Sequence, residues 1–138
     1  YTFVMHKTFL YSALFIGGGI FGWAVDTIYR SFQSGHYASG TLVPFFAIIY
    51  AIGAVMLYIF FYFAKMQPLS SIMLGTVLCV ALELTGGIIS LSLIHYRLWD
   101  YSSSPFNFYG FINLEHTFYW FVLTCLFHLL YKYRFALK

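Results

Sequence analysis

The chain has 138 residues, of which 62% are hydrophobic and only 8% are charged, and its mean hydropathy is +0.81. Soluble domains usually carry about 25% charged residues, so this composition excludes a water-soluble globular protein and predicts one integral membrane domain over residues 1–138. The net charge of +3 is the difference between seven scattered bases and four acids, and it is too small to suggest a nucleic acid partner.

Four apolar runs predict an all-α membrane protein with four transmembrane helices. The runs cover residues 8–29, 41–64, 68–94 and 114–131. Pro44 is expected in the first turn of the second helix and Pro68 at the start of the third, where a missing N–H group costs little. Membrane lipid is therefore the expected surrounding of most side chains.

Small residues mark the expected helix-packing faces. Gly18 and Gly22 are four residues apart in the first helix, and in the third helix a stripe with the same spacing runs from Gly75 through Glu83 to Gly87. Such stripes let another helix approach closely, so these glycines are predicted to face helices rather than lipid.

The distribution of basic residues predicts the orientation in the membrane. Four spans place both termini on one side, and that side collects most of the bases: Lys7, Lys65, Lys132, Arg134 and Lys138. Only Arg30 and Arg97 are left for the other side. By the positive-inside rule, we expect cytoplasmic termini in a bacterial plasma membrane.

Residues 95–113 form the only long segment without a continuous apolar run, and they are expected to be an interfacial or re-entrant outer loop. The loop holds a Ser-Ser-Ser-Pro turn signal. Arg97, Asp100 and Glu115 are expected to form an outer charge cluster that clamps the loop, with Trp99 and Tyr101 as aromatic anchors. On the first helix, Asp26 and Arg30 have the spacing of an ion pair.

Glu83 is the residue with the strongest claim to chemistry, because it lies deep in the third helix. An ionised carboxylate in hydrocarbon costs several kcal/mol, so Glu83 must be paired, protonated or next to water. One interpretation is a site for a proton, a cation or a polar substrate group, and the other is a structural hydrogen bond between helices. Asp26 and Arg97 are its expected charged partners by depth.

The outer loop and two helices resemble a known family. The pattern in the loop consists of Trp99-Asp100-Tyr101-Ser102, Pro105-Phe106-Asn107, Gly110, Ile112 and Leu114. It resembles the signature of the CmpB-like type IV ABC-transporter permeases, and Glu83, sixteen residues before Trp99, matches an acid of their third helix. Asp26 stands where the first helix of that family has Glu. The resemblance extends over residues 9–125 and includes Asn107 among the candidate polar residues.

This resemblance implies a small permease-like subunit with a polar site open to the outer side. The chain contains no nucleotide-binding motif, so a separate ATPase would have to supply the energy. The alternative is an accessory subunit of a larger, bioenergetic membrane complex, packed against other membrane subunits, a second copy, lipids or pigments. An outer-leaflet enzyme is the least supported reading.

The sequence gives no catalytic motif, and we expect no enzyme activity, no cofactor and no metal. His95 and His116 lie near Asp100 and Glu115 in the sequence, but they lack the compact spacing of a metal-binding helix.

Overall fold

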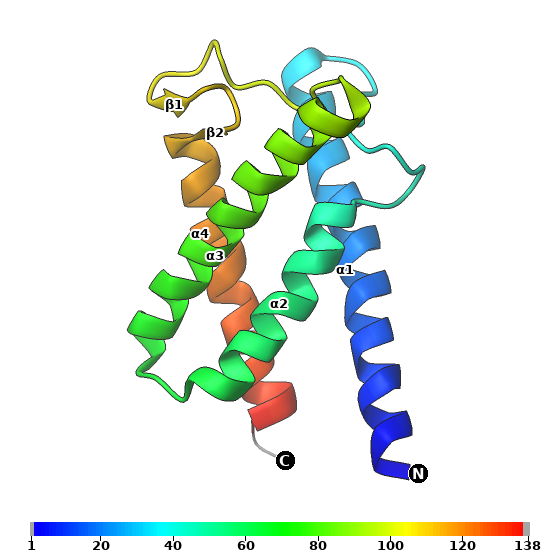
Figure 1. The fold of residues 1–138 in the computed structure, drawn as a ribbon, viewed down its shortest axis with the longest axis vertical. Helices are drawn as coiled ribbons and strands as arrows, with labels where there is room; N and C mark the ends of the chain where they lie inside the picture. Colours follow the sequence, from blue (N-terminus) through cyan, green and yellow to red (C-terminus); the bar gives the residue numbers. More distant parts are fainter. Residues whose placement is uncertain (1, 137–138) are drawn as a thin grey trace. The chain divides into compact units, whose positions relative to one another are not determined.

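The computed structural model describes the backbone of residues 2–136 and the side chains of residues 7–134. The elements, in chain order, are α1 (Thr2–Ser34), α2 (Ile48–Ala64), α3 (Pro68–Ile89), the π-helical turn η1 (Ser90–Ile94), β1 (Asn107–Phe108), β2 (Ile112–Asn113), α4 (Leu114–Tyr131) and the π-helical turn η2 (Lys132–Ala136) (Figure 1). The expected helical fold is confirmed, with a small β-hairpin added. The chain divides into two compact units, residues 1–56 and 57–138, and the boundary lies within α2.

The first helix is longer than predicted. It continues to Ser34, whereas the sequence suggested an end at residue 29. Gly35 follows with φ of +72°, and its N–H group donates to the carbonyl oxygen of Ser31 at 3.0 Å. This is the usual left-handed glycine that ends a helix, and nothing before it interrupts the helical hydrogen bonds.

The second helix is shorter than predicted, because it begins at Ile48 rather than at residue 41. Pro44 occupies a tight turn instead of a helical turn. The N–H group of Phe46 donates to the carbonyl oxygen of Val43 at 3.2 Å, and Phe45 between them has φ of +61°. Proline followed by a left-handed residue is typical of a turn, so the helix starts only after it.

The third and fourth helices begin where the sequence placed them. Pro68 is the first residue of α3, where its missing N–H group has no helical partner to lose. Asn113 caps α4, because its side-chain oxygen accepts from the N–H group of His116 at 2.7 Å. Glu115 in the first turn of α4 adds a favourable charge at the positive end of the helix dipole.

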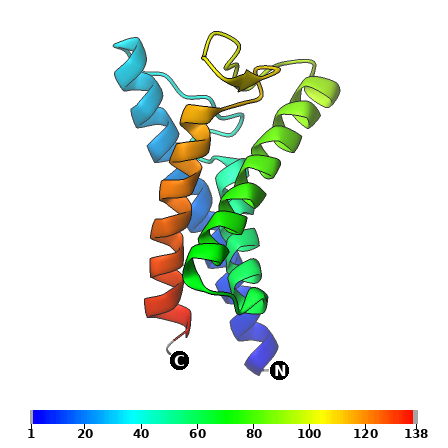
Figure 2. The same ribbon diagram turned by 90° about the vertical axis from the view of Figure 1, so that its left-hand side faces the viewer.

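The segment between η1 and α4 is an irregular loop that ends in a two-stranded antiparallel hairpin. Its register pairs Asn107 with Asn113 and Phe108 with Ile112. Figure 2 shows the hairpin at the N-terminal end of α4. No helix lies within residues 95–113, so this outer loop is not a helical re-entrant segment.

Much of the apolar surface of the described residues is exposed. The buried apolar side chains are few: Ala47, Ala51, Leu57, Phe61, Cys79 and Trp120. Large apolar side chains such as Phe32, Phe63 and Leu93 are more than two-thirds exposed, at 89%, 73% and 76%. Two helical stretches, Lys7–Ser34 and Pro68–Ile94, are long and apolar enough to cross a membrane, and α2 is apolar but shorter. These features are those of a membrane protein.

The glycines of α1 differ sharply in their surroundings. A Cβ atom added to Gly18 would lie 2.7 Å from the Cβ atom of Ala54, and one added to Gly22 would overlap Tyr50. A Cβ atom on Gly17 would meet nothing within 4 Å. Gly18 and Gly22 therefore allow α1 to approach the first half of α2, within unit 1.

Candidate functional site

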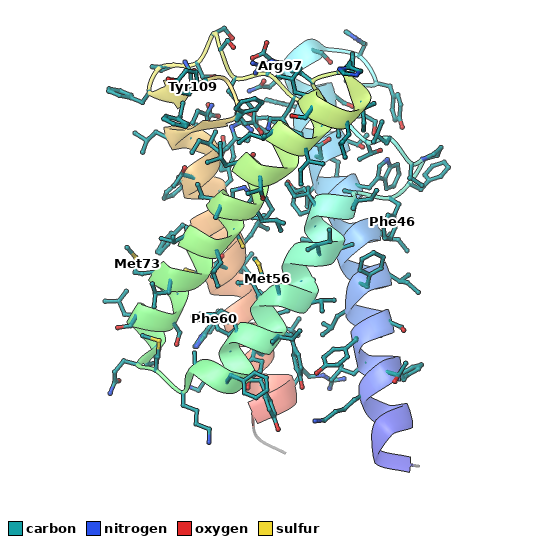
Figure 3. The ribbon with its side chains drawn as sticks, in the orientation of Figure 1. Phe46, Met56, Phe60, Met73, Arg97 and Tyr109 are labelled. Atoms are coloured by element: carbon teal, nitrogen blue, oxygen red, sulfur yellow. The ribbon has the colours of Figure 1, made fainter. Side chains whose placement is uncertain are left out.

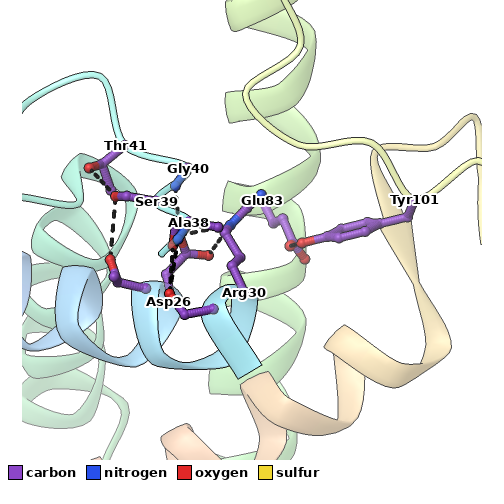
Figure 4. Close-up of polar contacts among 10 residues, drawn as sticks. Asp26, Arg30, Ala38, Ser39, Gly40, Thr41, Glu83 and Tyr101 are labelled. Atoms are coloured by element: carbon purple, nitrogen blue, oxygen red, sulfur yellow. Dashed lines mark hydrogen bonds and ion pairs between the residues drawn. The ribbon is translucent and has the colours of Figure 1, made fainter. Parts of the chain in front are cut away.

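Glu83 is a buried acid with two aromatic hydrogen-bond donors. Its residue is 4% exposed. One carboxylate oxygen, Oε1, accepts from the hydroxyl group of Tyr101 at 2.9 Å, and the other, Oε2, accepts from the indole Nε1 of Trp120 at 2.9 Å. Figure 4 shows the Tyr101 side chain reaching from the loop to Glu83 on α3. We call Glu83, Tyr101 and Trp120 the Glu83 site, and it joins α3, the outer loop and α4.

Neutral groups, not charged ones, bind Glu83 in unit 2. No Lys, Arg or His side chain among the described residues from 57 to 134 forms an ion pair with it. The expected partner Arg97 instead pairs with Asp100. Trp120 was not singled out from the sequence. The sequence feature that could have indicated its role is the indole N–H donor on an apolar helix. A buried Trp usually donates this N–H group to an acceptor, and Glu83 is an acceptor in a neighbouring apolar helix.

Small side chains on α3 allow α4 to bring Trp120 close to Glu83. Thr124, one turn after Trp120, is fully buried. Its Oγ1 atom lies 3.9 Å from the Sγ atom of Cys79, and a Cβ atom on Gly75 would lie 2.9 Å from its Cγ2 atom. The stripe of small residues on α3 thus faces α4 below the Glu83 site.

Tyr101 is held on both sides by the loop and α4. Its ring stacks on the imidazole of His116, with 4.1 Å between ring centroids. Its N–H group donates to the carbonyl oxygen of Gly110 at 2.9 Å. His116 Nδ1 lies 2.9 Å from the side-chain oxygen of Asn113, the cap of α4. The phenol is therefore aimed at Glu83 by the same residues that start α4.

The expected clamp of the outer loop is centred on Arg97. Its Nη1 atom donates to the carbonyl oxygen of Tyr109 at 3.1 Å and lies 3.6 Å from a carboxylate oxygen of Asp100. Its guanidinium carbon is 4.6 Å from the ring centroid of Phe111. Figure 3 shows Arg97 and Tyr109 at the loop end of the unit.

Trp99 and Gly87 connect this clamp to α3. The indole Nε1 of Trp99 donates to the carbonyl oxygen of Phe111 at 2.9 Å. A Cβ atom on Gly87 would lie 2.7 Å from the Phe111 ring and 3.4 Å from the Trp99 ring. Gly87 therefore makes room for the loop aromatics rather than for another helix.

Asn107 and Gly110 shape the tip of the loop. The side-chain amide of Asn107 donates to the carbonyl oxygen of Ser104 at 2.8 Å, and its oxygen accepts from the N–H group of Gly110 at 3.0 Å. Gly110 has φ of +74°, and a Cβ atom there would lie 2.6 Å from Asp100 Oδ1. Asn107 therefore serves the hairpin fold.

Asp100 is stabilised in its charged form by the loop. Hydrogen bonds from the hydroxyl group and then the N–H group of Ser102, together with the charge of Arg97, hold the pKa of Asp100 below its ordinary value of 3.8. Because folding lowers this pKa, the charged carboxylate stabilises the folded state at pH values above the ordinary pKa. That stabilisation is lost as the pH falls through the pKa of the folded state.

We therefore expect acid to loosen the loop. Tryptophan fluorescence should change reversibly as the pH falls below 3.8. Asp100→Asn should give the loosened signal at neutral pH and remove the acid transition, and Glu115→Gln is the control for a neighbouring exposed acid. An unchanged acid transition in Asp100→Asn would contradict this assignment.

In unit 1, Asp26 and Arg30 form the ion pair that their spacing suggested. The Nε atom of Arg30 lies 2.8 Å from Asp26 Oδ2, and the N–H group of Gly40 donates to the same oxygen at 3.2 Å. Figure 4 shows this pair on α1. Asp26 thus ties the end of α1 to the following loop.

The remaining acid, Glu115, accepts from the hydroxyl group of Tyr119 at 2.7 Å.

Within the part of the chain that the structure describes, no three His, Cys, Asp or Glu side chains converge as metal ligands would. Lys138, one of the bases used for the topology prediction, lies outside the described residues.

Comparison with known proteins places this chain in a family. The model of the family described as "Putative ABC-transporter type IV" matches residues 13–136. No curated protein and no solved structure matches the chain significantly. Because the family model covers nearly the whole chain, the chain belongs to this ABC-transporter-related membrane family.

Proposed function

We propose that the protein is a permease-like subunit of a membrane transporter and that the Glu83 site is its polar site. The single observation that carries this proposal is a buried carboxylate, 4% exposed, on a helix apolar enough to cross a membrane. Burying an acid in such a helix is costly, and intramembrane acids commonly mark substrate or ion pathways. Membership in an ABC-transporter-related family supports transport as the process.

In this proposal, all four α-helices cross the membrane as one domain. The 17 residues of α2 and the 18 residues of α4 give lengths of about 26 and 27 Å at 1.5 Å per residue. The hydrocarbon layer is about 30 Å thick, and short helices are accommodated by local thinning at modest cost. Both termini would lie in the cytoplasm of a bacterial cell.

The outer loop would then separate Glu83 from the external water. Tyr101 connects the loop to the carboxylate, so a ligand from outside would meet the loop first. In this proposal the polar groups of the loop and of α1 lie on the outer side: Asp26, Arg30, Arg97, Trp99, Asp100, Asn107 and Glu115. The partners would be membrane lipid, a separate ATPase and other membrane subunits or a second copy.

A structural role in a larger bioenergetic complex is the second candidate. The extensive exposed apolar surface favours it, because such surface suits partner helices, lipids or pigments as well as bulk lipid. In that case the Glu83 site would only fasten the outer loop to α3 and α4.

Purification in mild detergent from the native membrane distinguishes the two candidates. The proposal predicts stable capture of an ATPase that carries the phosphate-binding loop this chain lacks. Capture within a respiratory or photosynthetic assembly, without such an ATPase, would favour the structural role. Gly22→Leu, which should separate α1 from α2, is the control. A partner that is still captured by this variant binds independently of the native fold.

Accessibility labelling tests the orientation. In a background with Cys79 and Cys125 replaced by serine, Ser103→Cys should react with an impermeant thiol reagent added outside intact cells. Lys138→Cys should react only after the cells are opened, because the side with most bases stays in the cytoplasm. External labelling of Lys138→Cys would overturn the proposed topology.

A further inference from the structure

The segment that runs from Glu83 through the outer loop to Glu115 carries more acids than Lys and Arg residues. Residues 83–115 contain three of the four acids of the chain, Glu83, Asp100 and Glu115, but only one base, Arg97. Arg97 is already occupied by Asp100 and by the Tyr109 carbonyl oxygen. A segment with excess negative charge attracts cations and repels anions, so an anionic substrate would meet repulsion along this segment.

The groups next to Glu83 favour an organic cation over a metal ion. A metal ion such as Na⁺ or Ca²⁺ needs several oxygen ligands around it. The described partners of Glu83 are instead an indole N–H group and a phenol, both presented by aromatic rings. These rings meet Glu83 through their O–H and N–H groups, so a cation at the carboxylate would reach the ring faces only after Tyr101 has moved. Ring faces bind organic ammonium-type cations, whose charge is diffuse and whose surface is apolar.

The same aromatic surroundings already hold one organic cation of the protein itself. The guanidinium group of Arg97 lies 4.6 Å from the centroid of the Phe111 ring. Phe111 and Trp99 lie against Gly87, one helical turn beyond Glu83 on the same face of α3. The aromatic residues thus extend from the clamp of the outer loop to the acid, in the direction by which a ligand from outside would reach it.

We propose that the Glu83 site binds a lipophilic organic cation, with Glu83 as the counter-charge and the rings of Tyr101 and Trp120 as the walls. This inference rests on the proposed function, because it names the substrate class of the same polar site. Tyr101 must move when the ligand enters, since its hydroxyl group occupies one carboxylate oxygen. It lies on the loop rather than on a helix, so this movement leaves α3 and α4 in place.

Binding of a probe cation tests the proposal on the purified full chain in detergent. The probe is tetraphenylphosphonium, and neutral triphenylphosphine oxide of similar shape is the matched control for hydrophobic partitioning. We expect saturable binding of the cation only. Glu83→Gln should weaken it by about 10- to 100-fold, as expected for loss of a charge-assisted contact. Asp26→Asn should change it by less than about threefold, because Asp26 pairs with Arg30 in unit 1 and lies outside the loop that carries Tyr101.

A second measurement avoids any variant. Dicyclohexylcarbodiimide modifies carboxyl groups in apolar surroundings, and tetraphenylphosphonium should protect Glu83 of the wild-type chain from it, as read by peptide mass spectrometry. Equal binding by Glu83→Gln, equal binding of the neutral probe, displacement by Na⁺, or modification of Glu83 without protection would each overturn the proposal. If the cation does not bind but an ATPase is captured, the cation proposal is wrong and the permease role stands. If the cation binds but no ATPase is captured, the permease role is wrong and the cation site stands.

Discussion

Replacing Glu83 with leucine is expected to lower the free energy of unfolding by about 2–5 kcal/mol. Leucine fills the space but removes both acceptors, so the Tyr101 hydroxyl group and the Trp120 N–H group each lose the bond they make to Glu83. Loss of a hydrogen bond between a buried carboxylate and its donor costs about 1–3 kcal/mol. Thermal unfolding of the purified protein in detergent should show a lower midpoint.

Glutamine at position 83 is the matched control. Its oxygen can accept from Trp120, which only donates, while its NH₂ group can donate to the hydroxyl oxygen of Tyr101, which can also accept. Glu83→Gln should therefore keep stability within about 1 kcal/mol of wild type. Equal stability of the Leu variant and wild type would show that these hydrogen bonds contribute nothing to the fold.

Replacing Gly22 with leucine is expected to destabilise unit 1 by at least about 1–3 kcal/mol. A Cβ atom there overlaps the Cβ and ring atoms of Tyr50, close to the backbone of α2. Rotation of the Tyr50 side chain cannot relieve an overlap with its own Cβ atom, so α1 and α2 must separate. Loss of folded protein on size-exclusion chromatography and a lower unfolding temperature would measure the effect.

Gly17→Leu is the control, because it adds the same side chain to the same helix where a Cβ atom has open space within 4 Å. It should behave like wild type, apart from a small gain from the higher helix propensity of leucine. If both variants unfold at the wild-type temperature, Gly22 faces lipid and the close approach of the two helices is wrong.

Much of the fold follows from the sequence, because long apolar runs and the positions of proline carry the information. Pro68 predicted the start of α3 correctly, since both the composition change and the proline coincide there. The prediction that Pro44 lies in the first turn of the second helix was wrong, because a proline near the start of an apolar run fits a helix as well as a turn. Only the left-handed conformation of Phe45, which apolar patterning does not encode, separates the two.

The candidate site was predicted only in part. Glu83 was identifiable because an acid in an apolar run is rare, and Tyr101 because it lies in the distinctive loop. Trp120 was missed because an aromatic residue within an apolar helix looks like ordinary packing. Its role depends on α4 lying against α3, which is a long-range contact that Cys79 and Thr124 show in the structure but no local pattern indicates.

Infrared difference spectroscopy decides most directly whether Glu83 is a binding group or only a packing group. Spectra of the purified chain with and without tetraphenylphosphonium would be compared for wild type, Glu83→Gln and Asp26→Asn. We predict a cation-induced change in the carboxyl stretching bands of wild type and Asp26→Asn that is absent from Glu83→Gln. The same carboxyl change in folded Glu83→Gln, or none in folded wild type, would contradict a binding role for Glu83.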